Sequence, residues 1–391
     1  MQPLSPVDAI SPAFSRTRTI LTPPGPVPGQ PTPFRFWFFL KITVIAALTQ
    51  GNIYAAVFAL AFDAIFFSLM LTVGFRSVRL SNAPFAVAGG ISPFAIAAIL
   101  IAGLIALLVA IFFAWIWCRV RFTLFDLVLY RRGLVGPAWS PYASQAWRFL
   151  GLMMLIGLAL LLILAVTIGP LLIHLIALIR HLTPQQINAD PSIFFAHILP
   201  MYGIIFLFAL LAGLVNAITQ DFVLPPMALE DAPLEFAFGR FFQLLRTRFW
   251  YVALYMLLRF VLELGLSWIG MIAVFIVLAI LGVGGAGVGF VLYRAFWHAG
   301  PGGIAIFVLY CIVAGLAILA VYLLLLMVIY GVVAVVKQCY AAYFYGSYYP
   351  LLGDRLEPPP PITPASIPLA PVTFDPFPPL LPPDQPPPAV S

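Results

Sequence analysis

The chain has 391 residues, of which 63% are hydrophobic and only 8% are charged. Soluble globular proteins carry about 25% charged residues, and several apolar runs here exceed the roughly 20 residues that cross a hydrocarbon core. The composition therefore excludes an ordinary soluble fold. The net charge is +6, but the cations stand at the ends of apolar runs rather than in one patch. The charge therefore does not indicate a nucleic-acid partner.

Composition divides the chain into three regions. Residues 1–33 are rich in proline and contain no apolar core, so we expect no signal peptide there and predict a disordered tail. Residues 34–349 hold the apolar runs and are predicted to be a helical transmembrane domain, whose first span serves as an uncleaved targeting signal. Residues 350–391 are again rich in proline and are predicted to be a disordered tail that samples polyproline II.

Residues 34–50 begin with aromatic side chains and carry Arg35 and Lys41. Two cations in so short a run favour a helix that lies at the membrane surface, with Trp37 at the depth of the headgroups. The alternatives are that the segment dips into the membrane and returns, or that it crosses. A crossing would change the number of transmembrane helices by one.

We predict an all-α bundle of about six transmembrane helices, because six apolar runs are long enough to span a membrane. Gly169-Pro170 is expected to kink or end the third of them. The glycine-rich stretch 282–303 contains a G-x-G-x-x-G pattern, but it follows an apolar helix rather than a strand. Close helix packing or an outer loop is therefore expected there, not a dinucleotide site. The predicted spans are residues 51–75, 93–118, 150–179, 196–218, 251–281 and 304–336.

Three ionisable residues inside these spans are candidate intramembrane sites. Asp63 lies near the middle of the first span, where it either makes a hydrogen bond between helices or serves as a proton or ion relay. Arg259 and Glu263 are four residues apart in the fifth span, which places them on one helix face as a predicted ion pair. That pair is either structural, with one end wet, or part of a gate or substrate contact.

Two segments between spans, residues 119–148 and 221–248, are predicted to be amphipathic elbows on the same side of the membrane. Each carries an Asp-x-Val-Leu sequence, at Asp126 and Asp221, and each ends in an arginine flanked by aromatic residues. The end of the sixth span repeats the pattern weakly at Gln338-Cys339-Tyr340. This parallel repeat indicates a bundle built from helical hairpins rather than from inverted repeats.

Each elbow also supplies candidate functional residues. We expect Asp126 and Asp221 to cap short elbow helices, because a carboxylate accepts hydrogen bonds from the free N–H groups at a helix start. Arg148 and Arg248 stand where each elbow meets the next span, and we expect them to contact anionic lipid headgroups.

The lysines and arginines predict the orientation. With six spans, fourteen of the nineteen cations fall on one side, four fall in the opposite loops and Arg259 lies within a span. This bias predicts a cytoplasmic-membrane protein whose two termini are cytoplasmic. The fourteen are Arg16, Arg18, Arg35, Lys41, Arg119, Arg121, Arg131, Arg132, Arg148, Arg240, Arg246, Arg248, Lys337 and Arg355.

Two motifs carry a resemblance to known proteins. The pattern R-F-x-L-x-D-x-V-L runs from Arg121 to Leu129, and D-F-V-x-P-x-M-x-L-E runs from Asp221 to Glu230. Together they resemble a group of uncharacterised bacterial polytopic membrane proteins, which is similar in turn to the membrane domain of glycerophosphoryl diester phosphodiesterases. The resemblance covers roughly residues 34–349 and implies a six-helix protein of the bacterial cytoplasmic membrane. It implies no catalysis, because the soluble barrel that carries the phosphodiesterase activity has no counterpart here.

Three function classes remain from the sequence. We expect a non-enzymatic scaffold, assembly or regulatory component, whose partners are the lipid bilayer, anionic headgroups, and a membrane or cytoplasmic protein. The alternative is a permease or exporter of a small solute or lipid. An intramembrane lipid enzyme comes last, because the chain has no paired carboxylates with a companion histidine, no H-E-x-x-H and no G-x-S-x-G. We therefore predict no catalytic residue, no cofactor and no metal site.

Overall fold

The computed structural model describes residues 3–22, 34–50, 93–130, 139, 141–181, 192–297 and 300–358. The first predicted span, residues 51–75, and Asp63 within it lie outside these ranges. The described elements are α1 (Ile10–Leu21), α2 (Phe36–Leu48), α4 (Pro93–Tyr130), α6 (Ala143–His181), α8 (Ser192–Ile218), the π-helical turn η1 (Thr219–Val223), α9 (Leu224–Glu230), α10 (Leu234–Thr247), α11 (Phe249–Phe296), α12 (Pro301–Gly346) and α13 (Pro350–Leu356).

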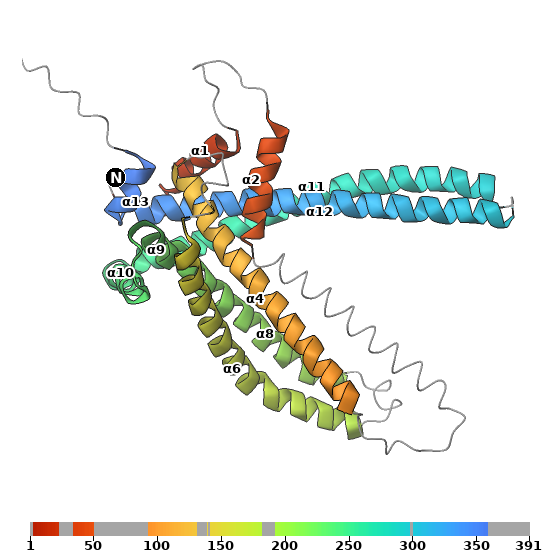
Figure 1. The fold of residues 1–391 in the computed structure, drawn as a ribbon, viewed down its shortest axis with the longest axis horizontal. Helices are drawn as coiled ribbons and strands as arrows, with labels where there is room; N and C mark the ends of the chain where they lie inside the picture. Colours follow the sequence, from red (N-terminus) through yellow and green to blue (C-terminus); the bar gives the residue numbers. More distant parts are fainter. Residues whose placement is uncertain are drawn as a thin grey trace, which may run out of the picture.

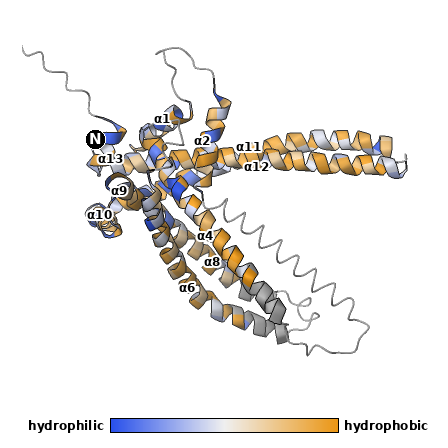
Figure 2. Ribbon diagram, in the orientation of Figure 1, coloured by the Kyte–Doolittle hydropathy of each residue, from blue (hydrophilic) through white to orange (hydrophobic). Residues whose placement is uncertain are grey.

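The long helices form two arms that diverge from one end of the molecule (Figure 1). One arm consists of α4, α6 and α8, and the other is the antiparallel pair α11 and α12. We call the region where they meet the junction. It contains α1, α2, η1, α9, α10 and α13 together with the adjoining ends of the long helices, and the main cluster of buried apolar residues lies there. Figure 2 shows that apolar residues dominate the arms, whereas polar residues gather at the junction.

The described part of the chain contains five helices that are long and apolar enough to cross a membrane. Bulky apolar side chains of these helices, such as Leu161, Phe206, Phe275 and Leu309, are mostly exposed along the arms. Such surfaces are stable in lipid rather than in water. The all-helical, multi-pass membrane class is thereby confirmed. The five segments are Gly103–Tyr130, Ala143–Leu171, Leu199–Glu230, Phe249–Phe296 and Pro301–Gly346.

Residues 282–296 of the glycine-rich stretch belong to α11, so of the two expected alternatives close helix packing holds there and not an outer loop. α11 continues to Phe296, and α12 begins at Pro301, directly after Gly300 with φ of 80°. Tyr310 on α12 donates a hydrogen bond of 2.7 Å to the carbonyl of Gly285. A Cβ built on Gly289 would lie 3.3 Å from the Tyr310 ring. Packing of α12 against these glycines therefore overrides their low helix propensity.

α2 has 13 residues, which makes it about 20 Å long and too short to cross a hydrocarbon core by itself. Its buried residues, Ile42, Thr43, Ala46 and Ala47, lie on one face against α12. A Cβ on Gly331 of α12 would collide with the backbone carbonyl of Thr43. Small residues on both helices thus allow their backbones to approach closely. Among the sequence interpretations, the crossing helix is disfavoured, and the surface and dipping alternatives remain.

The predicted N-terminal disordered tail is wrong for residues 3–22, because α1 packs into the junction. Arg16 is buried, and its guanidinium donates hydrogen bonds of 2.9 Å to the Val128 carbonyl and 2.8 Å to the Leu129 carbonyl. These carbonyls lie in the last turn of α4, where no helical donor follows. Arg16 therefore caps the C-terminus of α4, where the partial negative charge of the helix end favours a cation.

The C-terminal tail also begins later than predicted. Residues 350–356 form α13, in which Leu352 and Leu356 are buried against the junction. Arg355 donates a 2.7 Å hydrogen bond to the hydroxyl of Tyr130 at the end of α4. The remainder of the predicted tail, residues 359–391, lies outside the described residues.

Candidate functional site

A π-helical turn connects α8 to α9 without interrupting the helical path. The turn begins at Thr219, whose carbonyl accepts a hydrogen bond from the N–H of Leu224. Pro225 and Pro226 follow in the first positions of α9. Prolines lack N–H groups, and a first-turn position tolerates that loss. The fourth predicted span therefore ends too early at residue 218: the helical path continues to Glu230, before Asp231 in a left-handed conformation with φ of 50°.

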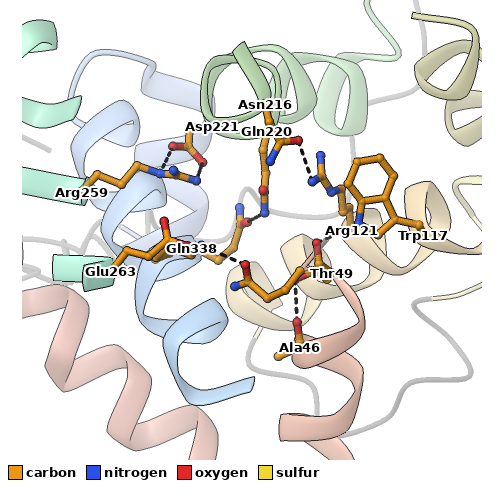
Figure 3. Close-up of polar contacts among 12 residues, drawn as sticks. Ala46, Thr49, Trp117, Arg121, Asn216, Gln220, Asp221, Arg259, Glu263 and Gln338 are labelled. Carbon is orange, nitrogen blue, oxygen red and sulfur yellow. Dashed lines mark hydrogen bonds and ion pairs between the residues drawn. The ribbon is translucent and has the colours of Figure 1, made fainter. Parts of the chain in front are cut away.

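Asp221 in this turn is 1% exposed and is the centre of a buried charge pair. Its Oδ2 lies 2.6 Å from Nε of Arg259 on α11 and accepts a 2.8 Å hydrogen bond from the Tyr255 hydroxyl. Figure 3 shows the Arg259 side chain extended toward the carboxylate. The sequence predicted that Asp221 caps an elbow helix, and that prediction is wrong. The π-helical turn places its carboxylate against α11, inside the packed junction, instead of at a free helix start.

A second ion pair, in which only the lysine is buried, lies next to the first. Nζ of Lys337 on α12 is 2.6 Å from Oε1 of Glu263 on α11, and it also donates a 3.0 Å hydrogen bond to Oε1 of Gln50. The predicted ion pair between Arg259 and Glu263 is therefore wrong. These two residues share a helix face, but each pairs across a helix interface, where buried partners from other elements replace water.

Neutral amides and one stacked arginine extend the network toward α4 (Figure 3). Nε2 of Gln220 donates a 3.1 Å hydrogen bond to Oε1 of Gln338, which joins η1 to α12. Arg121 on α4 donates a 2.8 Å hydrogen bond to Asn216 on α8, and its guanidinium lies 3.7 Å from the centre of the Trp117 ring. We refer to the residues Gln50, Arg121, Asn216, Gln220, Asp221, Tyr255, Arg259, Glu263, Lys337 and Gln338 as the polar cluster.

The weak sequence repeat is visible in these contacts. Asp126 is buried within α4 and accepts a 2.8 Å hydrogen bond from the Tyr142 hydroxyl, just as Asp221 accepts one from Tyr255. Gln220 and Gln338, which occupy corresponding positions, bond to one another. The predicted capping role of Asp126 is wrong, because α4 continues without interruption to Tyr130 and leaves no helix start at Asp126.

The two elbow arginines lie at the surface of the junction. Arg148 forms a 2.7 Å ion pair with Asp231, and both side chains are largely exposed. Arg248 is exposed between α10 and α11, 5.8 Å from the centre of the Tyr251 ring. Exposed pairs of this kind contribute about 0–1 kcal/mol to stability. Contact of Arg148 and Arg248 with lipid headgroups stays a prediction.

The polar cluster brings together residues that are up to 287 positions apart in the chain, as in the hydrogen bond between Gln50 and Lys337. Sequence reasoning singled out Asp221, Arg259 and Glu263 but missed Lys337, which it placed just after the sixth span and counted only among the cytoplasmic cations. A signal was available: Lys337 follows an apolar run directly and precedes Gln338, the counterpart of Gln220 in the repeat.

The chemistry available to the polar cluster is limited by its charge balance. Asp221 and Glu263 are matched by Arg259 and Lys337, so each carboxylate has a cation within hydrogen-bonding distance, and the remaining cation, Arg121, donates to Asn216 and lies over the Trp117 ring. A cavity of about 200 Å³ between α8 and α11 is lined by Arg259 and Glu263 and otherwise mainly by apolar side chains. Among the described residues, no group of three or more histidine, cysteine, aspartate or glutamate side chains could hold a metal ion.

Comparison with known proteins places the chain in a family without assigning it an activity. No curated protein and no solved structure matches it. The relation to the membrane domain of glycerophosphoryl diester phosphodiesterases finds no support in these comparisons and stays a prediction. The model of a family of unknown function (DUF7544) matches residues 4–354, and the chain therefore belongs to that family.

Proposed function

We propose that this protein is a non-enzymatic membrane scaffold in which the polar cluster fixes the geometry of two apolar arms. The observation that carries the proposal is the use of the buried charges. Asp221, Arg259 and Lys337 are each less than 10% exposed, and each is paired with a residue of another element. Charged side chains inside a membrane protein are costly and often mark transport paths. Here they connect η1, α11, α12 and Gln50, which follows α2, to one another.

Such a network favours one arrangement of helices over others. A buried ion pair adds little net stability relative to apolar packing, but breaking it by removing one partner is strongly destabilising. Arms that slid or rotated at the junction would leave Arg259 of α11 without Asp221, which follows α8 in the other arm. The pair of Lys337 and Glu263 lies within one arm, where it holds α12 to α11. The network therefore supports a rigid junction, which suits a scaffold that holds its partners in fixed positions.

The arms supply the surface for assembly. Apolar side chains such as Trp268, Ile269 and Phe275 on α11 are more than 60% exposed, and no other described residue covers them. In a membrane these surfaces contact lipid or the helices of another protein. We propose that partner membrane proteins dock on the arms and that cytoplasmic partners dock on the junction. The distribution of lysine and arginine favours a cytoplasmic position for the junction and for both ends of the chain.

The test is to extract the protein in native lipid discs and to quantify by mass spectrometry what accompanies it. The scaffold proposal predicts a stoichiometric protein partner that is retained by Arg148→Gln, in which only an exposed pair is lost. The same partner should be depleted in Asp221→Asn, in which the junction is weakened. A protein that is isolated without a protein partner but with a defined solute would count against a scaffold.

A permease is the second candidate, and the cavity beside Arg259 and Glu263 is the observation that favours it. Glu263 is 36% exposed despite its pair with Lys337, and it lines the space of about 200 Å³ between α8 and α11. In a permease, Glu263→Gln would abolish flux while the amount of protein in the membrane stayed constant. Loss of protein without a specific loss of flux would identify Glu263 as structural.

The orientation can be tested separately. After the exposed Cys311 is replaced by serine, single cysteines are introduced at Glu357 beside the junction and at Gly302 at the far end of the α11–α12 arm. We expect a membrane-impermeant maleimide added to intact cells to label Gly302→Cys but not Glu357→Cys. The reverse labelling would place the junction outside the cytoplasm.

A further inference from the structure

A groove of about 480 Å³ lies apart from the polar cluster, between the end of α10 and the end of α12. Its walls include Arg240, Gln243 and Thr247 of α10, Arg248 immediately after that helix, and Tyr345 of α12. Binding sites for small molecules have volumes of about 300–1,000 Å³. The groove is therefore large enough to receive a polar headgroup, and its walls are rich in hydrogen-bond donors.

The charge of the groove favours an anion. The guanidinium of Arg240 is held 4.4 Å from the centre of the Phe236 ring and 3.3 Å from the Glu230 carboxylate. Arg248 forms no ion pair with any described residue. Two arginines against one carboxylate leave an excess of positive charge, and arginine matches the geometry of phosphate oxygens.

A buried donor provides a second, independent observation. Tyr345 is 3% exposed, and its hydroxyl has no hydrogen-bond partner within the described ranges. Its ring is held between Phe222, at 5.2 Å, and Tyr349, at 5.4 Å between ring centres. A buried hydroxyl without a partner is unfavourable, so an acceptor oxygen brought by a ligand would satisfy it.

The groove lies where lipid headgroups are expected. Phe249, Trp250 and Tyr251 follow Arg248 at the start of α11 and are all exposed, with Trp250 at 79%. Exposed aromatic residues at the start of an apolar helix are typical of the boundary between lipid and water.

Burial raises the pKa of the Tyr349 phenol above its ordinary range, as does the neighbouring Glu230. This wall of the groove therefore stays neutral and does not repel an anion.

We propose that this groove binds a phosphate group, presented either by an anionic lipid headgroup or by a soluble phosphate ester. Arg240 and Arg248 neutralise its charge, and the Tyr345 hydroxyl donates a further hydrogen bond. The aromatic boundary beside the groove favours the lipid as the source. The site is separate from the polar cluster, so it does not depend on whether the protein acts as a scaffold or a permease.

The experiment titrates delipidated full-length protein in neutral detergent with short-chain phosphatidylglycerol, with glycerol 3-phosphate and with short-chain diacylglycerol. We expect Arg248→Gln to weaken phosphate binding about tenfold or more, and Tyr345→Phe to weaken it roughly three- to tenfold. Arg246→Gln is the matched control, because Arg246 is an exposed arginine in the last turn of α10 that does not line the groove. The affinity of Arg246→Gln for the phosphate ligands should equal that of the native protein.

Thermal unfolding separates a binding defect from a folding defect. Without ligand, Tyr345→Phe should keep the melting temperature of the native protein, because the hydroxyl it removes has no partner in the described structure. With ligand, only the native protein and Arg246→Gln should gain the full stabilisation. Preferential binding of phosphatidylglycerol or of glycerol 3-phosphate identifies the source of the phosphate. Equal binding of diacylglycerol, equal loss in Arg246→Gln, or no binding of either phosphate would overturn the proposal.

Discussion

Replacing Asp221 by asparagine tests whether the buried charge pair holds the junction together. The substitution keeps the size of the side chain and its ability to accept the hydrogen bond from Tyr255, so it removes mainly the negative charge. Arg259 would then be buried, at 7% exposed, with its nearest partner neutral. Loss of one member of a buried ion pair costs about 3–5 kcal/mol. Glu263 on the same helix face can offset part of this, so we expect the lower end of that range.

A double-mutant cycle isolates the pair. Arg259→Gln alone should be as damaging as Asp221→Asn alone, because it leaves the opposite charge uncompensated. The double variant restores charge balance, so its loss should be smaller than the sum of the two single losses. Residues in direct contact show coupling energies of up to about 3 kcal/mol, and we expect a value near that limit.

The measurement is equilibrium unfolding in mixed micelles with increasing SDS, followed by circular dichroism. The matched control is the exposed pair of Arg148 and Asp231, for which the same cycle should give about 0–1 kcal/mol. Additive losses for Asp221 and Arg259 would refute the reasoning, because they would mean that the two charges do not interact in the folded protein.

Two further predictions concern the packing of short helices on the junction. Gly331→Val should release α2 from α12, because a Cβ at Gly331 collides with the Thr43 carbonyl. A disulfide cross-link engineered between α2 and α12 should therefore fail to form in this variant. Gly265→Ala has no heavy atom within 4 Å of the new Cβ and should keep the cross-link. Arg16→Met should expose α1 to limited proteolysis, because it removes the hydrogen bonds to the last carbonyls of α4. Unchanged cleavage of α1 would contradict a capping role for Arg16.

Much of the fold could be predicted from apolar periodicity and length. The amphipathic segment predicted within the second elbow is α10, whose buried residues Ala237, Phe241 and Leu244 recur at helical spacing. Helix ends were predicted less well. Residues 282–296 continue α11 because Tyr310 on another helix packs against the glycines, and this contact cannot be recognised from composition.

The polar cluster shows the same division. Sequence spacing correctly placed Arg259 and Glu263 on one helix face, but it predicted them to pair with each other. Their actual partners, Asp221 and Lys337, come from η1 and α12, which lie at distant positions in the chain. A spacing rule considers only neighbours on one helix, whereas a buried charge pairs with whichever opposite charge the packing brings within reach.

The sequence by itself determined the environment of this protein. A chain with 8% charged residues and long apolar runs is stable only where water is excluded, and that physical requirement holds for any arrangement of its helices. Only the tertiary structure decided which polar residues meet, how η1 directs Asp221 into the junction, and where the two arms diverge. These features depend on contacts between elements far apart in the chain, and local propensity carries no information about such contacts.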